Sequence, residues 1–495
     1  MSQGFGRWRF DVSHKARLGA AALAVAWVVG CANKSSPSPP GAAGGAGGAG
    51  GTPNDADATP DVEAPVDANS TPVDAASPVD AEVWQDREAP VGFVHADGAR
   101  LLDGSGSPLL LRTAALGNWL LNEGYMWRFM GPAGDRGRRI EQRIVELIGE
   151  TDAAAFWQSF RNGYVTEADF FRISSLGFNS VRLAINARLL MPEGQTAFDE
   201  NEFRHLEDVV EWGTRQGVYV IFDMHGAPGG QTGTNIDDDA DNTPALFTNA
   251  MNQDRLVALW TEIARRFSDR TIVLGYDLLN EPLPGTTPNF LPLYRTQLWP
   301  LYQRVSQAIR AVDPNHVLIV EGGNWANDWT TLGPPYDANM MYSFHKYCFS
   351  CTAADLAASE TVSSIQTYLA YRTAWNRPIW CGEAGENTNA WYRAVYQMFE
   401  DNGVGWTFWT WKKTRSTNNP YSITPPAGWA AIQTYVQASA SDAGPPTVPP
   451  AADSKAAFDQ FLINIRLDQN TLNQAVLCSL PAAISSRVGC PTVGD

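Results

Sequence analysis

Short apolar runs alternate with longer amphipathic stretches over the middle of the chain. The apolar runs are residues 109–114, 180–185, 218–224, 271–279, 317–321, 340–345, 378–383 and 405–411. Runs of this length with little polar interruption are typical of strands buried on both faces, as in a parallel sheet. Between the runs, apolar residues recur at helical spacing, as in residues 138–148, 199–216, 255–267 and 301–312. The alternation predicts βα units joined into a parallel sheet.

Eight such runs with helical crossovers predict an α/β fold, a (β/α)8 TIM barrel that spans residues 91–440. An open, doubly wound sheet is the alternative. It is disfavoured because no glycine-rich phosphate-binding loop follows the first apolar run. A barrel of this type carries its functional residues on the loops at the carboxyl ends of the strands.

The segments that flank the predicted barrel have a different composition. Residues 31–90 consist largely of Gly, Ala, Pro, Ser and Asp, with too few large apolar side chains to offset the entropy lost on folding. We expect a low-complexity, disordered N-terminal tether there. Residues 441–495 begin as a proline-rich linker, and residues 456–480 have helical periodicity, which predicts a short helical C-terminal extension.

The beginning of the chain has the pattern of a targeting segment. Four basic residues lie within residues 7–17, an apolar stretch follows at residues 18–29, and Cys31 comes directly after a glycine. The arrangement resembles a bacterial lipoprotein signal peptide over residues 1–30, with Cys31 as the lipidated first residue. An ordinary secretory signal is the alternative. Both imply export, so we expect the protein at the cell surface or in the periplasm, lipid-anchored through Cys31 alone, or released extracellularly.

Charge and composition narrow the range of partners. The formal net charge is −17, but residues 55–88 hold ten acidic residues and one arginine, so the predicted barrel is only mildly acidic. The balance argues against a nucleic-acid partner. The chain has 18 tryptophans, whose rings stack well on the apolar faces of sugars, although most are expected in the core.

Five cysteines remain besides Cys31. In an oxidising compartment Cys478 and Cys490 can close one loop, and Cys348 and Cys351 a second, tight one, which leaves Cys381 over. The alternative for the Cys348-x-x-Cys351 pair is a zinc site, but the sequence holds no second pair of this kind. The sequence alone leaves the pairing open.

Polar and aromatic residues stand around the predicted carboxyl ends of the apolar runs. They are Arg182, His225, Asn280, Glu281, His345, Tyr347, Glu383 and Trp409. Glu281 and Glu383 belong to the fourth and seventh runs, so a barrel places them across its mouth from each other. Two carboxyl groups about 5 Å apart suit retaining glycoside hydrolysis, in which one attacks the sugar and the other protonates the leaving oxygen. The alternative for either glutamate alone is an ion pair near a loop.

Several motifs carry a resemblance to a known family. In chain order they are Leu116-Gly117-Asn118-Trp119-Leu120, Glu123-Gly124-Tyr125-Met126, Gly177-Phe178-Asn179-x-Val181-Arg182, Asp223-Met224-His225-Gly226-Ala227-Pro228-Gly229, Asn280-Glu281-Pro282 and Gly382-Glu383-x-Gly385. Together they resemble glycoside hydrolase family 5 over residues 91–440. The resemblance implies that Glu281 is the acid/base and Glu383 the nucleophile. Ala384 departs from the family pattern, because many members carry an aromatic residue there, and the departure bears on the shape of the nucleophile's pocket.

The chemistry of this reaction gives the neighbouring residues expected roles. Arg182 is expected to keep the carboxylate of Glu383 ionised and oriented, since a fixed cation favours the ionised form. The resemblance implies that Tyr347 donates a hydrogen bond to the same carboxylate. Glu281 must keep a proton at working pH, so we expect its pKa to be raised while Glu383 is ionised.

Four residues are expected to contact the sugar. Asn280 is placed to hydrogen-bond the 2-hydroxyl. His225 and His345 are expected to bind other hydroxyls, and Trp409 to form an apolar floor. For His345 the alternative is a hydrogen-bonded core histidine, and for Trp409 it is packing within the barrel.

Three loops bear on specificity. The loop 229–241 is long for a βα connection and rich in hydrogen-bonding groups, so we expect it to wall the cleft. Its Asp237-x-Asp239-x-Asp241 spacing also suggests calcium, but no bidentate glutamate follows at the spacing of a calcium loop. In the second loop, which follows the fifth run, Trp325 and Trp329 are candidate platforms for a sugar ring. In the third, just beyond Glu383, Glu386 and Asn387 are further candidates for sugar contact.

These observations lead to a functional prediction. We expect a retaining glycoside hydrolase, an O-glycosyl hydrolase that cleaves β-glucosidic bonds of a β-glucan by double displacement, with β-1,3- or β-1,6-glucan or a β-glucoside favoured. The alternatives are an endo-β-1,4-glucanase of the same family, a non-catalytic cell-surface glycan-binding lipoprotein and a metal-dependent barrel hydrolase. No cofactor or metal is expected, because the histidines lack paired ligand spacing. We expect a monomer, while linkage and endo or exo action stay open.

Overall fold

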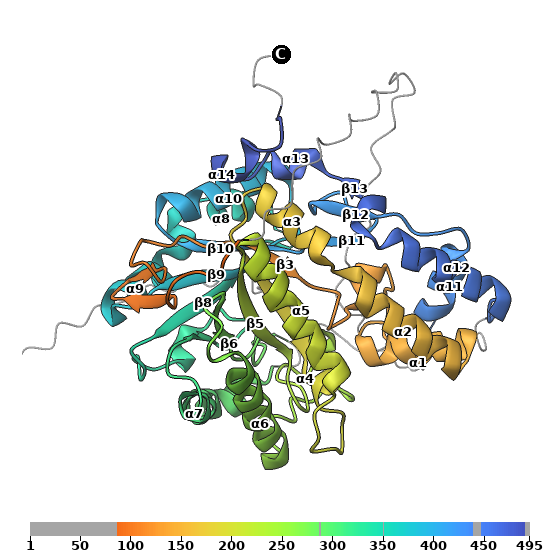
Figure 1. Cartoon of the computed structure of the whole chain (residues 1–495), viewed down its shortest axis with the longest axis horizontal. Helices are drawn as coiled ribbons and strands as arrows, with labels where there is room; N and C mark the ends of the chain where they lie inside the picture. The colour runs from red at the N-terminus through yellow and green to blue at the C-terminus, as the bar shows by residue number, and fades with distance from the viewer. Residues whose placement is uncertain (1–86, 287–288, 350, 439–446, 491–495) are drawn as a thin grey trace, which may run out of the picture. The chain divides into compact units, whose positions relative to one another are not determined.

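Eight parallel strands close into a barrel in the computed structural model, which describes residues 87–286, 289–349, 351–438 and 447–490 (Figure 1). The hydrogen-bonded order around the barrel is β10-β3-β4-β5-β6-β7-β8-β9. The described residues belong to one compact unit, residues 64–495. The barrel strands are β3 (Arg112–Leu116), β4 (Ser180–Asn186), β5 (Tyr219–Gly226), β6 (Val273–Asp277), β7 (Val317–Glu321), β8 (Met340–Lys346), β9 (Ile379–Gly385) and β10 (Gly405–Trp409). The predicted TIM barrel is confirmed.

Each of the predicted runs overlaps one barrel strand, although the ends differ. The first strand, predicted from residue 109, begins only at Arg112. The backbone N–H of Leu109 instead donates to the carbonyl of Leu101 at 2.9 Å. Leu101 belongs to an N-terminal hairpin that is described below. Most strand residues are buried, as expected where helices cover the outside of a parallel barrel and side chains fill its inside.

Helices surround the barrel and supply most crossovers (Figure 1). They are α1 (Gly137–Ile148), α2 (Glu150–Tyr164), α3 (Glu167–Ser175), α4 (Ala187–Leu190), α5 (Glu200–Gln216), α6 (Ala250–Phe267), α7 (Leu291–Arg310), α8 (Ala353–Ser359), α9 (Gln366–Trp375) and α10 (Asn389–Asp401). The four predicted amphipathic helices correspond to α1, α5, α6 and α7.

The crossover from β7 to β8 departs from the predicted pattern. Residues 322–339 contain a single 3-10 turn, η3 (Trp329–Thr331), and no α-helix. Asn324, Trp325 and Ala326 adopt φ angles of 54°, 58° and 66°. Such left-handed backbone is incompatible with a right-handed helix, so the chain forms a tight turn at the barrel mouth instead.

Helix α5 shows how local sequence places a strand. The side chain of Asp199 accepts hydrogen bonds from the backbone N–H groups of Asn201 and Glu202, which otherwise lack partners in the first turn. Gly217 ends the helix with a φ of 64°, a conformation that glycine adopts without strain. The chain therefore turns sharply into β5, whose carboxyl end carries His225.

A hairpin that the sequence analysis did not anticipate covers the amino ends of the barrel strands. Strands β1 (His95–Asp97) and β2 (Arg100–Leu102) pair antiparallel. Val94 and Leu101 pack into a cluster with Leu111, Met341 and Trp380, which belong to the amino ends of the strands or directly precede them. The hairpin thus closes the end of the barrel opposite the strand mouths.

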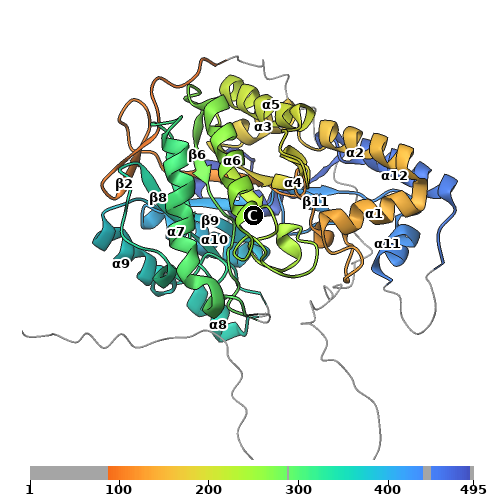
Figure 2. The same ribbon diagram turned by 90° about the horizontal axis from the view of Figure 1, so that it is seen from below.

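The C-terminal extension packs against the barrel's first helices. Helix α12 (Ala451–Asn464) contacts α1 and α2, and α11 (Trp429–Gln437) lies beside it (Figure 2). The prediction of a helix over residues 456–480 is wrong beyond Asn464, where α12 ends. The Lys412 ammonium donates a hydrogen bond to the backbone carbonyl of Ile465 at 3.1 Å, and the chain turns there. It continues through η5 (Leu467–Gln469), β13 (Thr471–Leu472), α13 (Gln474–Leu477) and α14 (Ala482–Ser485), with β13 joining β11 (Lys412–Thr414) and β12 (Tyr421–Ile423) in a small sheet.

The cysteines pair as the sequence suggested. Disulfides join Cys348 to Cys351 and Cys478 to Cys490, and Cys381 is a buried free thiol. The zinc alternative for the first pair is therefore wrong. The predicted signal peptide and most of the tether lie outside the described residues, so lipidation at Cys31 stays a prediction. Within the part of the chain that the structure describes, no helix combines the length and apolar character needed to cross a membrane.

An aromatic cluster holds the C-terminal extension in place and can be tested. The ring of Phe461 lies 5.2 Å from that of Trp127 and 4.4 Å from that of Trp429, and the side chain is fully buried. Phe461→Ala should lower the free energy of unfolding by about 3–5 kcal/mol, the usual effect of removing a buried ring. Urea unfolding followed by tryptophan fluorescence measures the change.

The same helix supplies the control for this substitution. Ile463 is 47% exposed, so Ile463→Ala should change the free energy of unfolding by about 0.5 kcal/mol or less. Equal losses in the two variants would contradict a structural role for the aromatic cluster.

Candidate active site

The structure gathers the eight residues singled out from the sequence around the carboxyl ends of the barrel strands. Arg182, His225, His345, Glu383 and Trp409 lie on β4, β5, β8, β9 and β10. The remaining three directly follow a strand: Asn280 and Glu281 come after β6, and Tyr347 after β8. A chain of hydrogen bonds and ring contacts connects all eight, so they form one site.

Glu281 and Glu383 approach each other closely. An oxygen of each carboxylate lies within 4.8 Å of the other and of a ring nitrogen of His345. Glu383 is only 4% exposed, and Glu281 is partly buried, with a left-handed φ of 44°. This upper limit of 4.8 Å is compatible with the roughly 5 Å between carboxyl groups in retaining glycosidases, and it is shorter than the roughly 6.5–9.5 Å of inverting ones.

Arg182 is the buried cation that organises this site. Its guanidinium donates to Glu383 Oε1 at 2.6 Å and to Asn280 Oδ1 at 2.9 Å, so the contact expected between Arg182 and Glu383 is present. It also forms ion pairs with Asp223, Asp277 and Glu321 at 3.2, 2.9 and 3.1 Å. Burial alone would lower the pKa of Arg182, but the surrounding carboxylates raise it, so the group stays charged.

His345 joins two carboxylates. Its Nδ1 lies 2.6 Å from Glu281 Oε1, and its Nε2 lies 3.0 Å from Glu321 Oε1. Burial opposes the charged form, but Glu321 and Glu383 raise the pKa of His345 well above its ordinary value, so both ring nitrogens carry protons to donate. The partners of His345 are therefore carboxylates and not the expected sugar hydroxyl. This arrangement is close to the alternative, a hydrogen-bonded core histidine.

Glu321, at the end of β7, is a residue that the sequence analysis missed. One carboxylate oxygen faces His345, and the other accepts the backbone N–H of Glu281 at 2.7 Å. Burial alone would raise the pKa of Glu321, but the charges of His345 and Arg182 hold it at about 2. Its position as the polar end of an apolar run was the available signal.

The environment of Glu281 favours its protonated form. Burial raises the pKa of Glu281, and the negative charge of Glu383 adds to the rise, whereas the hydrogen bond from His345 opposes it. The expected direction of the shift is present. A carboxyl group that keeps its proton to higher pH is suited to act as an acid.

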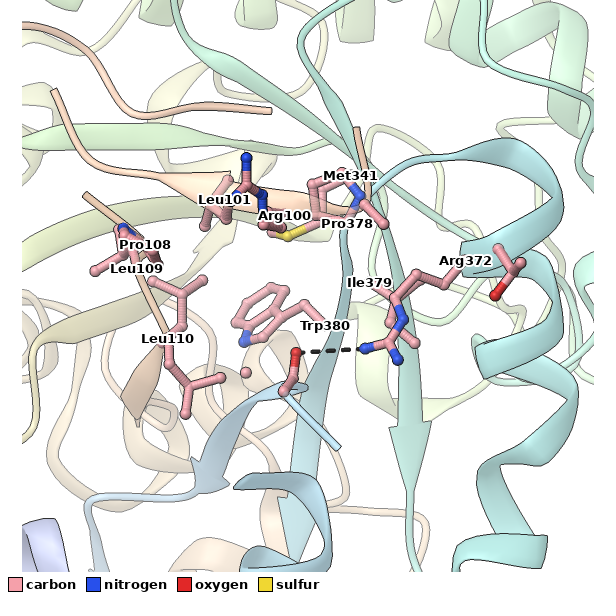
Figure 3. A pocket seen from close by; sticks show the side chains of 15 residues that line it. Arg100, Leu101, Pro108, Leu109, Leu110, Met341, Arg372, Pro378, Ile379 and Trp380 are labelled. Carbon is pink, nitrogen blue, oxygen red and sulfur yellow. Dashed lines mark hydrogen bonds between the residues drawn. The ribbon is translucent and has the colours of Figure 1, made fainter. Parts of the chain in front are cut away.

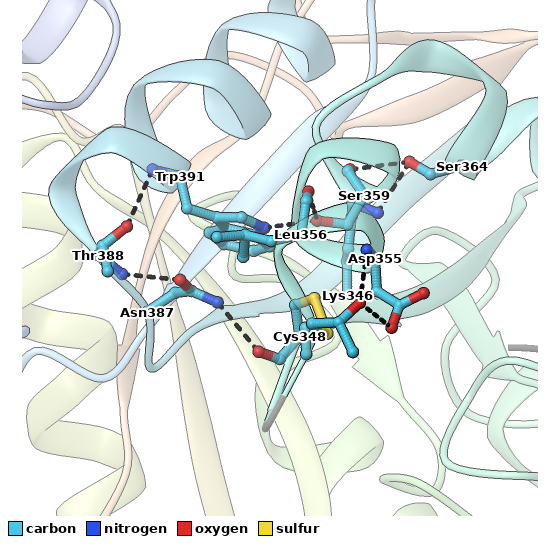
Figure 4. The surroundings of a disulfide bond; sticks show 11 residues. Lys346, Cys348, Asp355, Leu356, Ser359, Ser364, Asn387, Thr388 and Trp391 are labelled. Carbon is cyan, nitrogen blue, oxygen red and sulfur yellow. Dashed lines mark hydrogen bonds between the residues drawn. A yellow bond between two sulfur atoms is a disulfide. The ribbon is translucent and has the colours of Figure 1, made fainter. Parts of the chain in front are cut away.

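Tyr347 holds the second oxygen of Glu383. Its hydroxyl donates to Glu383 Oε2 at 2.8 Å. The disulfide between Cys348 and Cys351 follows directly, and the Asn387 side chain donates to the Cys348 carbonyl at 3.2 Å (Figure 4). Asn387, a candidate substrate contact, thus links the loop after β9 to the loop that carries Tyr347.

One wall of the site is formed by stacked rings. The rings of His225 and Trp409 lie 5.1 Å apart and are nearly parallel, with 3° between their planes. Trp409 Nε1 donates to the hydroxyl of Tyr125 at 2.8 Å, and His225 Nδ1 lies 2.8 Å from Asp223 Oδ2. Gly117 makes room for this wall, since a Cβ atom there would come within 2.9 Å of the Trp409 ring.

Glu123 is a second functional candidate that the sequence analysis passed over. It lies in the loop after β3 and is 4% exposed. Burial raises its pKa to about 8, with contributions from Glu383 and Glu281 that His225 partly offsets. The carboxyl group is therefore largely neutral at pH 7. An acidic residue within the quoted Glu123-Gly124-Tyr125-Met126 motif was the signal that could have found it.

The loop 229–241 supports the wall through hydrogen bonds. Gln231 Nε2 donates to the carbonyls of His225 and Asn280 at 2.7 and 2.9 Å. The four aspartates of the loop have protein donors: Asp237 accepts from Thr232 and Gly233, Asp238 from Arg138, Asn186 and Arg188, Asp239 from Arg136 and Thr243, and Asp241 from the Thr243 hydroxyl. Calcium would have to displace these donors, so the calcium alternative is disfavoured.

Three other specificity candidates differ in outcome. Trp329 is buried, and its indole N–H donates to the carbonyls of Ala326 and Ser343, so it is a core residue and its prediction as a sugar platform is wrong. Trp325 stays partly exposed in the tight turn after β7. Glu386 forms an ion pair with Lys413 beside Tyr125.

Glu281, His345 and Glu383 also form a group with metal-ligand atoms. A metal-binding imidazole must be neutral at its ligating nitrogen, whereas the pKa of His345 is raised and Nδ1 faces Glu281. Both oxygens of Glu383 already accept from Arg182 and Tyr347. These donors fit a hydrogen-bond network better than a metal ion.

Comparison with known proteins gives relatives among glycosidases. A Beta-xylosidase from Phanerodontia chrysosporium is 32% identical over 269 residues, which is 52% of this chain and 52% of that protein. A Probable glucan 1,3-beta-glucosidase A from Emericella nidulans is 28% identical over 241 residues, 48% of this chain and 57% of that protein. The chain spans about half the length of the curated relatives it matches.

A solved structure supports the fold, and a family model identifies the family. A rutinosidase from Aspergillus niger matches with a TM-score of 0.50 and 18% identity over 62% of this chain and 90% of that one, which supports the fold. The family model described as Cellulase (glycosyl hydrolase family 5) matches residues 146–415, a segment that contains both Glu281 and Glu383. Since this match covers more than half of the chain, the protein belongs to glycosyl hydrolase family 5.

Proposed function

We propose that the protein is a retaining β-glycosidase that cleaves β-glucosidic bonds, with a β-1,3- or β-1,6-glucan or a β-glucoside as substrate. The observation that carries the proposal is the approach of Glu281 and Glu383 to within 4.8 Å, because this leaves room for direct attack but not for an intervening water. The relative named as a glucan 1,3-beta-glucosidase supports the substrate class. An endo-β-1,4-glucanase of the same family is the alternative.

In the first step, Glu383 is the nucleophile. A carboxylate oxygen of Glu383 donates an electron pair to the anomeric carbon while the bond from that carbon to the leaving oxygen breaks. Arg182 and Tyr347 each bind one oxygen of this carboxylate, so its orientation is fixed before the sugar arrives. Glu281 transfers its proton to the leaving oxygen.

In the second step, Glu281 reverses its role. Once Glu383 is bound to the sugar as an ester, it no longer carries the negative charge that helps to raise the pKa of Glu281. The pKa of Glu281 therefore falls, and Glu281 is already ionised because it gave its proton to the leaving oxygen. As a base, it accepts a proton from a water molecule that attacks the anomeric carbon. The bond between the sugar and Glu383 breaks, and both carboxyl groups return to their starting states.

His345 and Glu321 position Glu281 for both steps. His345 donates to the side chain of Glu281, and Glu321 accepts from its backbone N–H. Two anchors therefore hold a residue whose backbone is in the left-handed region. The same imidazolium stabilises Glu281 when it becomes an anion after the first proton transfer.

The sugar pocket uses the remaining residues. Arg182 donates to the Oδ1 atom of Asn280. The amide nitrogen of Asn280 lies 3.4 Å from Nε2 of His225, and of its two N–H bonds one remains to donate to the 2-hydroxyl. Trp409 offers an apolar face, and the neutral carboxyl of Glu123 can both donate and accept at a sugar hydroxyl.

A second candidate substrate is a β-xyloside, because the relative named Beta-xylosidase shares 32% identity. A xylosyl unit lacks the exocyclic hydroxymethyl group of glucose. The choice therefore depends on whether the pocket accommodates and binds that group.

Replacing the nucleophile tests the mechanism. Glu383→Gln should lower kcat on an aryl β-glucoside by at least about a thousandfold, because an amide cannot form the glycosyl ester. A mechanism-based fluorosugar should label Glu383 in the native protein, as measured by mass spectrometry of its peptides. Labelling of Glu281 would reverse the two assignments.

The pH profile tests the acid. Glu281 donates only while protonated, so kcat/KM on a substrate with a poor leaving group should fall as pH rises through the raised pKa of Glu281. Glu281→Gln should be about a hundredfold or more slower on that substrate and lose this alkaline fall, since no proton remains to be lost. A dinitrophenyl glycoside, whose dinitrophenolate group leaves without needing a proton, should restore much of the rate of Glu281→Gln.

Glu123→Gln is the control for that profile, since the pKa of Glu123 is about 8. It should retain the alkaline fall. A fall that persists in Glu281→Gln and disappears in Glu123→Gln would assign the titration to Glu123 and contradict the proposed acid.

A substrate panel separates the two candidate functions. We expect kcat/KM for nitrophenyl β-glucoside to exceed that for the β-xyloside by at least about tenfold, the size of effect that one missing group produces. β-1,3- and β-1,6-linked glucans should be cleaved faster than β-1,4-linked ones. The reverse monosaccharide preference would favour the xyloside, and no release from any member would refute the proposed function.

A further inference from the structure

A disulfide lies next to the tyrosine that holds the proposed nucleophile. The hydroxyl of Tyr347 donates to Glu383 Oε2 at 2.8 Å. Tyr347 is followed by Cys348, which forms a disulfide with Cys351. Burial and the negative charge of Glu383 raise the pKa of Tyr347 well above its ordinary value, so the hydroxyl keeps its proton and stays a donor. The proposed glycosidase reaction uses this hydroxyl and gives the disulfide no role.

The disulfide closes a very short loop. Its two cysteines are 3 positions apart in the sequence, whereas Cys478 and Cys490 are 12 positions apart. A cross-link restricts the unfolded chain less when the loop that it closes is shorter, so the first disulfide adds less to global stability than the second. It restricts instead the local backbone between the end of β8 at Lys346 and the beginning of α8 at Ala353.

Two hydrogen bonds anchor this loop near its ends. Strand β8 ends at Lys346, and beyond it the Asn387 side chain donates to the carbonyl of Cys348 at 3.2 Å (Figure 4). At the other end, the side chain of Thr352 accepts from the backbone N–H of Asp355 at 3.2 Å and so begins α8. The disulfide is the covalent cross-link between these two anchors.

Phe349 connects the closed loop to the tyrosine ring. It lies inside the disulfide loop, and its ring is 4.9 Å from the ring of Tyr347, with 15° between the two planes. Phe349 is 64% exposed, so burial in the core does not hold it in this position. The restraint comes from the loop, which keeps one ring against the other and thereby limits the positions open to the Tyr347 hydroxyl.

A reductant can reach the disulfide from the mouth of the barrel. Cys348 and Cys351 are both partly exposed, and they follow the carboxyl end of β8. The cavity of about 550 Å³ at the opposite end is a separate place, lined by Met341 and Ile379 at the amino ends of β8 and β9 (Figure 3). The thiol of Cys381 is fully buried, so it is closed to reagents in solvent.

We propose that the disulfide between Cys348 and Cys351 positions Tyr347 on Glu383, so that turnover is fastest while this disulfide is closed. A dithiol opens it in two steps: one thiolate attacks a cysteine sulfur and forms a mixed disulfide, and the second thiol then displaces the protein sulfur. The S–S bond of the protein becomes two S–H groups, and the dithiol becomes a disulfide. The inference rests on the proposed glycosidase function, since Glu383 acts there as the nucleophile.

Turnover of an aryl β-glucoside before and after treatment with dithiothreitol tests the proposal. We expect kcat to fall at least about fivefold on reduction while KM changes less than about twofold, because a displaced nucleophile slows bond formation more than substrate binding. Maleimide labelling with mass spectrometry identifies the opened cysteines, and circular dichroism should stay unchanged. An unchanged kcat after Cys348 and Cys351 have been reduced would overturn the proposal.

Tyr347→Phe separates positioning from a general loosening of the fold. This variant lacks the hydroxyl, so its kcat should be at least about tenfold lower in the oxidised protein, and reduction should change it less than about twofold further. A fall on reduction as large as in the native chain would contradict the inferred role. The double variant Cys348→Ser with Cys351→Ser should match the reduced native chain and should not respond to dithiothreitol.

The second disulfide supplies the matched control. It belongs to the C-terminal extension, where the Ala483 carbonyl lies close to Gly177, ahead of the amino end of β4. Cys478→Ser with Cys490→Ser should keep the native kcat and the native fall on reduction. Loss of that fall in this control would assign the effect to the wrong disulfide and refute the proposal.

The melting temperature gives a readout that needs no glycosidase activity. Tyr347→Phe should lower it more in the oxidised protein than in the reduced protein, because only the closed loop holds the hydroxyl on Glu383. Equal shifts in the two states would overturn the inference whether or not any glycoside is cleaved. Unequal shifts in a chain that cleaves no glycoside would refute the proposed function alone.

Discussion

Arg182 is fully buried in the centre of the barrel, where its single guanidinium faces four carboxylates. In so dry an environment neither the cation nor the anions are stable alone, and removing one partner of such a network leaves an uncompensated charge. Strands β4, β5, β6, β7 and β9, or the ends of these strands, each contribute a charged residue to it. The ion pairs therefore fix the relative positions of the strand ends on which the site is built.

The excess of negative charge around Arg182 has a chemical consequence. Burial opposes the charged forms of His345 and His225, but the carboxylates that surround them raise both pKa values. Glu321 stays ionised, while Glu281 and Glu123 hold protons to higher pH. Carboxyl groups only a few ångströms apart thus have different proton affinities, which is the condition for one to act as a base and another as an acid.

The sequence predicted the features that depend on local pattern. Apolar periodicity identified the barrel strands, and polar residues at their carboxyl ends identified Glu281, Glu383 and Arg182. It did not predict which atoms would pair: Glu321 and Asp277 end buried runs, but their contact with Arg182 arises only when separate strands meet. Trp325 and Trp329 occupy the same short segment, and only the tertiary packing places Trp329 in the core. The hairpin of β1 and β2 was missed because three-residue strands give no periodic signal.

The aromatic cluster around Phe461 affects how the chain can fold. Barrel closure already pairs distant segments, as in the hydrogen bond from Gly117 to Thr410, which are 293 positions apart. Trp127, near the start of the barrel, is covered by Phe461, which lies beyond the last barrel strand. During synthesis the first helices would thus stay incompletely covered until the segment that carries Phe461 has left the ribosome, and contacts of such long range form slowly. A chain ending at residue 440 would contain every barrel strand and both glutamates, yet would leave this aromatic surface exposed to aggregation.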